Sequence, residues 1–525
     1  MELAAIFKDG MVLQQNQKNR IWGKSVDEEI IEIDFDGKKY CTKGKNGEWA
    51  ITIEPVAVGG PYEMAIKSSF NGEMVLKDIL VGEVWFAGGQ SNMELELQNS
   101  DDGKNVCQNS DYDWIRFYNV PKYAKLDDGL LEEEEHTLWK KASGMQCADM
   151  SAVAFYFAKN IYEVLRVPVG IIDCYWGGTS ATCWFSRNMI SDVPEVMDYI
   201  EEWDEVIANK SDEQYEAEMK EYDDRYQAWN SRVEKLRADK PDITWEEINE
   251  TAGICPWPQP MGGGSPFRPF GLYESMVKRV APYGIKGFLY YQAEEDWSRA
   301  SYYEKLNQAV IEQWREVFSY DEKKDIPFLI TQLPMYIAKG EEDVHNFARL
   351  REQQSLTAEH NSNVGLAVLI DCGEFDNIHP TDKETPGKRL AFQALGKVYG
   401  KIEKYDSMKV EHVNFFEETA IVSFLNTYGE IRARFTDKVS LTAKREDSEV
   451  PAKVLSSDKI FGFEISGDGK VFYPANVLVV GEKIKISSEK VSRPVALRYG
   501  YTDFGVVNVY NAAGLPLAPF VWNKN

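Results

Sequence analysis

A serine and a histidine in this chain have the type and setting needed for nucleophilic catalysis. Ser91 stands in GGQSNM, where a β-prone run ends at Gly88 and Gly89 and helix-forming residues follow. A strand, a tight turn and a helix start can expose a nucleophile and offer unpaired backbone amides to an oxyanion. Serines at helix starts are more often simple N-caps. The assignment therefore depends on finding a base elsewhere in the chain.

The best candidate for that base is His379. It lies in DCGEFDNIHP, directly after the apolar run GLAVLID, and Asp376 precedes it by three residues. That spacing can bring a carboxylate to the imidazole, where it would fix the tautomer and stabilise the imidazolium. The alternative is that Asp376 caps a helix near Pro386 or closes a turn, with His379 on the surface. Together with the Ser91 turn, the pattern favours a Ser-His-Asp triad.

The elements that must position these residues alternate between strands and helices after about residue 79. The apolar strand candidates are 84–87, 169–174, 287–291, 328–331 and 365–370, and helical periodicity covers 151–165, 302–317 and 390–399. Such alternation predicts a parallel sheet covered by helices on both faces. Ligands bind at the carboxyl ends of the strands in these sheets. Ser91 and His379 would both lie at such ends.

The sequence predicts three domains. Residues 1–78 and 402–525 consist of short alternating runs separated by turns and are each expected to form a β-sandwich. Residues 79–401 form the α/β domain, interrupted at about 187–262 by an acidic helical segment with an aromatic stripe. We expect a helical hairpin that packs this stripe on the main domain, with a lid or an oligomer contact as the alternative.

Composition and residue spacing argue against several classes of partner and cofactor. A net charge of −26 argues against nucleic acid or an anionic membrane as the main partner. Seven widely spaced cysteines without a CxxC pair favour a reducing compartment. We find no signal peptide or membrane-spanning run, and no cluster with metal-ligand spacing. The expectation is a cytoplasmic protein that needs no metal and no organic cofactor.

Four ordered blocks carry a family resemblance. GGQSNM, GIIDCYWGGTSATCW, GFLYYQAEEDW and DNIHP resemble the blocks of SGNH-hydrolase carbohydrate esterases, in the branch named for sialate O-acetylesterase that also includes acetylxylan esterases. Segments near both ends, such as KDGMVLQQNQKNRIWG and VYNAAGLPLAPF, look like the same branch. The resemblance implies a flavodoxin-like, three-layer SGNH hydrolase domain between the two sandwiches. It also implies deacetylation of a sugar by a serine esterase.

By this resemblance, Ser91 would be the nucleophile, His379 the general base and acid, and Asp376 the orienting carboxylate. The oxyanion hole would consist of the Ser91 amide, a glycine amide, for which Gly178 is favoured over its neighbour, and the Gln292 side chain. The family usually has a glycine where this chain has Ala293. A methyl group there could narrow the pocket or shift the preceding glutamine.

Two other functions and the choice of sugar stay open at this point. A glycosidase could use Glu294 and Asp296 as its two carboxylates, and a non-catalytic protein could bind carbohydrate through its aromatic residues. The substrate could be O-acetylated sialic acid or an acetylated xylo-oligosaccharide. The acidic surface disfavours the anionic sugar at long range, although Arg268 or Arg299 near the pocket could reverse that.

Overall fold

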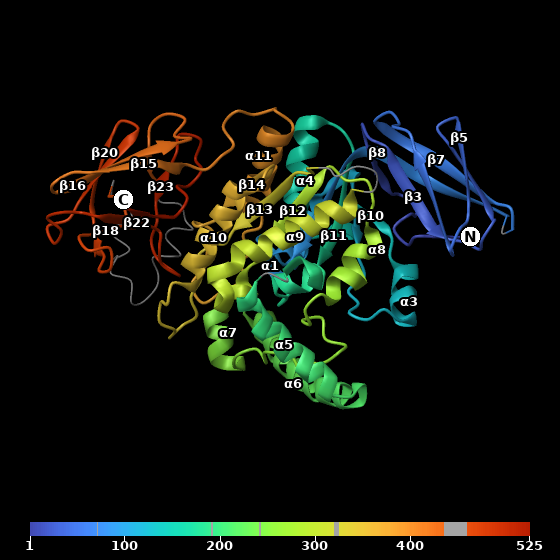
Figure 1. The fold of residues 1–525 in the computed structure, drawn as a ribbon, viewed down its shortest axis with the longest axis horizontal. Helices are drawn as coiled ribbons and strands as arrows, with labels where there is room; N and C mark the ends of the chain where they lie inside the picture. Colours follow the sequence, from blue (N-terminus) through green and yellow to red (C-terminus); the bar gives the residue numbers. More distant parts are fainter. Residues whose placement is uncertain (71, 191–192, 241–242, 320–324, 435–458, 525) are drawn as a thin grey trace.

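The chain is a mixed α/β protein with a central sheet between two β-rich regions (Figure 1). The computed structural model describes residues 1–524 except 71, 191–192, 241–242, 320–324 and 435–458. The excepted positions take in small parts of the predicted insertion and a larger part of the predicted C-terminal domain, so those parts of the prediction lie outside the described residues. The mixed α/β class is confirmed.

The central sheet brings the carboxyl ends of six parallel strands to one edge. Its strand order is β10-β9-β11-β8-β12-β13-β14, and β10 is antiparallel to β9 while the other neighbours are parallel. The strands are β8 (Gly72–Gly89), β9 (Asp111–Asn119), β10 (Trp139–Ser143), β11 (Val169–Tyr175), β12 (Gly287–Tyr291), β13 (Phe328–Gln332) and β14 (Val364–Val368). Strands β11 and β12 flank β8, so the segments that follow these three strands are neighbours.

Helices cover both faces of this sheet. Trp85 and Phe86 are consecutive in β8 and therefore point to opposite faces. Trp85 packs on Phe157 with ring centroids 5.0 Å apart, and Phe86 packs on Trp314 at 4.9 Å. These partners belong to α4 (Ala152–Leu165) and α9 (Tyr303–Phe318). The remaining helices of this region are α1 (Ser91–Glu94), α2 (Gly103–Asn109), α3 (Asp128–His136), α8 (Lys278–Val280), α10 (Asn346–His360) and α11 (Glu384–Gln393).

The N-terminal β-rich region is continuous with the central sheet through β8. Residues 72–81 of β8 pair with β7, and residues 83–89 pair with β11. The predicted boundary near residue 79 therefore falls within one unbroken strand. The other strands are β1 (Glu2–Leu3), β2 (Val12–Gln14), β3 (Asn19–Lys24), β4 (Ile30–Phe35), β5 (Lys38–Lys43), β6 (Glu48–Ile53) and β7 (Gly59–Ser68).

The C-terminal β-rich region has its own core. Its described strands form sheets of order β15-β16-β21-β20, β17-β23 and β19-β18-β22-β24. The core also takes in Met335 and Ile370 from the segments that follow β13 and β14. The strands are β15 (Lys409–Phe415), β16 (Thr419–Leu425), β17 (Arg432–Ala433), β18 (Phe463–Ser466), β19 (Tyr473–Pro474), β20 (Asn476–Val480), β21 (Lys483–Ser487), β22 (Ala496–Tyr499), β23 (Val509–Tyr510) and β24 (Phe520–Asn523).

The acidic segment forms helices that project from the carboxyl edge of the sheet (Figure 1). They are α5 (Pro194–Asn209), α6 (Asp212–Asp239) and α7 (Trp245–Ala252). Trp229 of α6 and Ile248 of α7 belong to a small separate core, and the Tyr222 hydroxyl donates to the Pro256 carbonyl at 2.9 Å. Part of the aromatic stripe therefore packs within the insertion, while Tyr199 packs against the core of the main domain as we expected.

Candidate active site

Ser91 stands where β8 ends and α1 begins. Gly89, the last residue of β8, has a φ of 138°, a conformation that favours glycine. A Cβ at Gly89 would lie 2.0 Å from the Tyr291 carbonyl oxygen, so the turn presses directly on β12. The Gln90 N–H donates to the same carbonyl at 3.1 Å. This turn holds the Ser91 side chain, partly exposed, at the carboxyl edge of the sheet.

His379 reaches Ser91 from the loop that follows β14. Its Nε2 lies 2.8 Å from Ser91 Oγ, which is hydrogen-bond distance. The His379 backbone N–H donates to Asn377 Oδ1 at 3.0 Å, which fixes the loop locally. Two residues predicted from separate motifs, 288 positions apart, are thus in contact.

Asn92, the residue after the serine, fixes the histidine loop to the serine turn. Its Nδ2 donates to the Ile378 carbonyl at 2.9 Å and to Glu294 Oε1 at 2.5 Å. The Asn92 side chain is buried, so these bonds are shielded from water. Sequence analysis gave Asn92 no role, and its only signal was its place beside Ser91 in the GGQSNM block.

Lys383 supports the same loop and acts on the histidine electrostatically. Its Nζ donates to Asn92 Oδ1 at 2.7 Å and to the Pro380 carbonyl at 2.6 Å. Burial, and next the Lys383 ammonium, disfavour the imidazolium and lower the pKa of His379 to about 4. Burial lowers the pKa of Lys383 itself to about 8, so it is still cationic at pH 7. His379 is therefore neutral at pH 7 and can accept a proton from Ser91.

Asp376 lies in this loop but is not bonded to the imidazole. Its Oδ1 accepts the Lys339 N–H at 2.9 Å, and its own N–H donates to the Ile337 carbonyl at 3.1 Å. Its φ of 54° is a left-handed conformation that aspartate tolerates. In the described part of the chain no hydrogen bond joins the Asp376 carboxylate to His379. The placement matches the turn-closing role that the sequence left open, and the role as third triad member stays a prediction.

The glycine pair after β11 lies against the serine. A Cβ at Gly177 would lie 3.2 Å from Ser91 Cβ, and the Gly177 N–H donates to the Glu94 carboxylate. Among the described residues the amides of Ser91 and Gly178 donate to no acceptor of the chain. Gly178 has a φ of 74°. Because the Gly177 amide is engaged, Ser91 and Gly178 have the amides that could hold an oxyanion.

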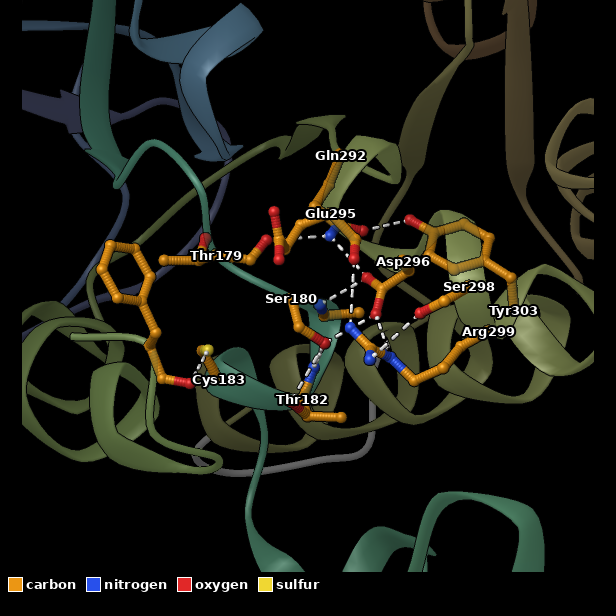
Figure 2. Close-up of polar contacts among 12 residues, drawn as sticks. Thr179, Ser180, Thr182, Cys183, Gln292, Glu295, Asp296, Ser298, Arg299 and Tyr303 are labelled. Carbon is orange, nitrogen blue, oxygen red and sulfur yellow. Dashed lines mark hydrogen bonds and ion pairs between the residues drawn. The ribbon is translucent and has the colours of Figure 1, made fainter. Parts of the chain in front are cut away.

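Gln292 lies in a buried hydrogen-bond network rather than at an open pocket (Figure 2). Its Nε2 lies within hydrogen-bond distance of Gln90 Oε1 at 3.2 Å, the Thr179 carbonyl at 3.1 Å and Asp296 Oδ2 at 2.7 Å. Its Oε1 accepts the Tyr303 hydroxyl. Both amide hydrogens thus have acceptors within the protein. This geometry does not direct Gln292 to an oxyanion, and its role as the third donor stays a prediction.

The two carboxylates considered for a glycosidase are also enclosed. The Asp296 carboxylate is fully buried. It accepts hydrogen bonds from the Ser180 hydroxyl at 2.6 Å, the Ala181 N–H at 2.8 Å and the Arg299 Nε–H at 3.1 Å (Figure 2). Glu294 is 4% exposed, and burial raises its pKa. A glycosidase needs two carboxyl groups that flank a sugar bond. The geometry gives neither residue that access, so it disfavours this alternative.

Two further properties of the described residues concern metal ions and membranes. No group of three or more His, Cys, Asp or Glu side chains in this part of the chain could hold a metal ion. None of the described helices is both long enough and apolar enough to cross a membrane.

Comparisons with known proteins place the chain among esterase relatives. No protein-family model matches it. The sialate O-acetylesterase of Mus musculus is 27% identical over 395 residues, which span 69% of this chain and 66% of the mouse protein. The Homo sapiens sialate O-acetylesterase is 22% identical over 565 residues, spanning 99% of this chain and 92% of the human protein. The crystal structure of a carbohydrate acetylesterase from Xanthomonas citri superposes with a TM-score of 0.75 and 26% identity, covering 99% of both chains.

These relatives bear on the resemblance predicted from the four sequence blocks. They include enzymes named for removing acetyl groups from sugars, and two of the alignments run along nearly the whole chain. The chain is therefore a homologue of carbohydrate esterases of the sialate O-acetylesterase type.

Proposed function

We propose that the protein is a serine carbohydrate O-acetylesterase that removes acetyl groups from an O-acetylated sugar through an acetyl-serine intermediate. The observation that carries the proposal is the 2.8 Å contact between His379 Nε2 and Ser91 Oγ, at the carboxyl edge of the sheet. The homology to enzymes named sialate O-acetylesterase and carbohydrate acetylesterase supports the same reaction class.

Acylation begins when Ser91 Oγ attacks the acetyl carbonyl carbon while His379 Nε2 takes the hydroxyl proton. The carbonyl oxygen becomes an oxyanion, which the amides of Ser91 and Gly178 stabilise. His379 then donates the proton to the sugar oxygen as the carbon–oxygen bond breaks. The free sugar alcohol leaves, and the acetyl group stays on the serine.

Deacylation repeats these steps with water. His379 takes a proton from a water molecule, the hydroxide attacks the acetyl-serine carbonyl, and the proton returns to Ser91 Oγ as acetate leaves. The described residues supply every proton transfer in this scheme, so it has no step that needs a metal or a cofactor. If Asp376 turns toward the ring during catalysis, it would stabilise the imidazolium, as the resemblance predicts.

The finer architecture and the cellular setting are part of this proposal. We propose that residues 79–401 form an SGNH hydrolase domain, and that the flanking regions 1–78 and 402–525 are β-sandwiches. The parallel strand order supports the former, and a core formed mainly by the C-terminal strands supports the boundary near residue 402. The N-terminal boundary crosses β8, which continues from one region into the other. All seven cysteines are free thiols, which supports a reducing compartment such as the cytoplasm.

The test is acetate release, followed by an enzyme-coupled assay, from acetylated xylo-oligosaccharides and from 9-O-acetylated sialic acid. We expect release from at least one substrate and a loss of at least about a thousandfold in Ser91→Ala, whose circular dichroism should match the parent. Equal release by the parent and Ser91→Ala would refute the proposal. Sugar binding that survives in Ser91→Ala, with no turnover by the parent, would favour a non-catalytic carbohydrate-binding protein.

A further inference from the structure

An exposed tryptophan lies beside the proposed oxyanion glycine. Trp257 is 48% exposed, and a Cβ at Gly178 would lie 2.3 Å from its Cη2 atom. The edge of the indole therefore meets the backbone of Gly178. The preceding Gly177 lies directly against Ser91. A large, partly exposed apolar side chain thus contacts Gly178, the residue that follows the neighbour of Ser91.

Contacts with Phe267 and, through the neighbouring Pro256, with α6 fix the position of this indole. Its ring packs edge-on against the ring of Phe267, with centroids 5.1 Å apart and an interplanar angle of 76°. The preceding residue, Pro256, is tied to α6 because its carbonyl accepts the Tyr222 hydroxyl at 2.9 Å. An aromatic ring that is already fixed and half-exposed suits stacking against the apolar face of a ligand, because the side chain loses little conformational entropy on binding.

The two arginines that could have received an anionic sugar are engaged elsewhere. Arg299 donates to Asp296 Oδ1 at 3.1 Å, and its guanidinium lies 4.2 Å from the centre of the Tyr199 ring. Arg268 donates to the Ala124 carbonyl at 3.1 Å. Recognition of a carboxylate favours a planar guanidinium that is free to form two parallel hydrogen bonds. Arg299 is thus occupied within the protein, whereas Arg268 uses one N–H and its buried Nε has no hydrogen-bond partner among the described residues.

Two carboxyl groups lie in the segments around the serine, together with the cations Lys122 and Lys383. Glu94 accepts the Gly177 N–H and pairs with Lys122, which neutralises that cation. Glu295 is partly exposed at the end of β12, and burial with the nearby Asp296 charge raises its pKa to about 7. The oxygens of both carboxyl groups can accept hydrogen bonds from sugar hydroxyls.

From this arrangement we propose that Trp257 is the sugar-binding platform of the site, and that the substrate is a neutral O-acetylated pyranoside. One apolar C–H face of the ring stacks on the indole while its acetyl group reaches Ser91 and the Gly178 amide. Burial of that face provides the binding energy, and carboxylates at the rim accept hydroxyl hydrogens. This assignment rests on the proposed esterase function and adds the substrate class and a specificity residue.

The experiment separates sugar recognition from chemistry by using substrates with and without a sugar. Steady-state rates are measured for neutral acetylated xylo-oligosaccharides, 9-O-acetylated sialic acid and ethyl acetate, with Trp257→Ala, Trp257→Phe and the parent. Trp114→Ala is the matched control. Trp114 is 41% exposed and adjoins Ile115, which pairs with Val169 at the opposite end of β11. Binding of the oligosaccharide to Ser91→Ala, with and without Trp257→Ala, is followed by calorimetry.

We expect Trp257→Ala to raise the KM for the neutral sugar about tenfold and to weaken binding in the Ser91→Ala background equally. It should lower kcat/KM for ethyl acetate, which has no ring to stack, by a clearly smaller factor than for the sugar, and Trp257→Phe should retain most of the affinity. The parent should prefer the neutral sugar to sialate by at least about tenfold in kcat/KM.

Three results would overturn the assignment. Equal losses on the sugar and on ethyl acetate would mean that Trp257 only supports Gly178. An unchanged KM for the sugar in Trp257→Ala would show that Trp257 is not the platform. A preference of the parent for sialate would show that the substrate class is wrong. If the parent shows no Ser91-dependent hydrolysis of any ester, the esterase proposal itself fails, and the calorimetry then decides separately whether Trp257 binds sugar.

Discussion

The loops that follow β12 and β14 both carry polar residues at the carboxyl edge of the sheet, but they use them differently. After β12, the Gln292 amide and the Asp296 carboxylate are buried and fully bonded within the protein. After β14, His379 is partly exposed and directs Nε2 to Ser91 Oγ. Buried polar groups need partners for stability. Gln292 and Asp296, whose hydrogen bonds are made inside the fold, maintain the site, whereas the partly exposed His379 contacts the nucleophile and can take part in the chemistry.

The largest effect should come from breaking the reactive loop. His379→Ala removes the only base in contact with Ser91 in the described structure, so acetate release should fall by at least about a thousandfold while the fold is retained. His412→Ala, an exposed histidine of β15, is the matched control and should be as active as the parent. Activity in His379→Ala close to that of the control would contradict the assignment.

The next largest effect should come from breaking the structural loop. Asp296→Ala leaves Arg299 and Ser180 without their buried acceptor, so the free energy of unfolding should fall by about 3–5 kcal/mol. Asp376→Ala removes one hydrogen bond, from the partly exposed Asp376 side chain to a backbone amide. It should lower the free energy of unfolding by only about 1 kcal/mol. Urea denaturation of both variants measures the difference. Equal destabilisation would remove the distinction between the two loops.

A smaller effect tests the electrostatics of the reactive loop. Burial is the main cause of the low pKa of His379, about 4, and the Lys383 ammonium lowers it further, so removal of the ammonium should raise that pKa. Because the base must be neutral, activity is lost below this pKa, and the acid limb of kcat/KM should move to higher pH by about one unit in Lys383→Gln. The glutamine can still donate to Asn92. Lys388→Gln, at an exposed position of α11, should leave the limb unmoved, and the same profile for both variants would exclude this role.

The contact between Ser91 and His379 could be predicted because local sequence fixes where each residue stands. The paired glycines end β8 and the apolar run of β14 ends before DCGEFDNIHP, so both residues had to lie at the carboxyl edge of a parallel sheet. Spacing along a chain does not fix side-chain partners in the same way. Asp376 has the expected spacing, yet its left-handed turn directs the carboxylate to the Lys339 amide.

Other features depend on contacts between distant segments that no local pattern reveals. Asn92 and Lys383 meet across 291 positions. The aromatic stripe of α6 has helical spacing, but that spacing could not tell packing on the main domain from packing within the insertion. Ala293 was flagged as a departure from the family glycine, and its φ of 156° is in a region that favours glycine. The substitution therefore adds backbone strain next to Gln292.

The central claim is that Ser91 is the nucleophile and that His379 activates it. The most direct test is covalent labelling by a serine-directed fluorophosphonate, read by mass spectrometry of the intact protein and of its peptides. The account predicts one adduct per chain, on Ser91, with labelling absent in Ser91→Ala and at least about a hundredfold slower in His379→Ala. An adduct on another residue, or an active parent that resists labelling, would contradict it.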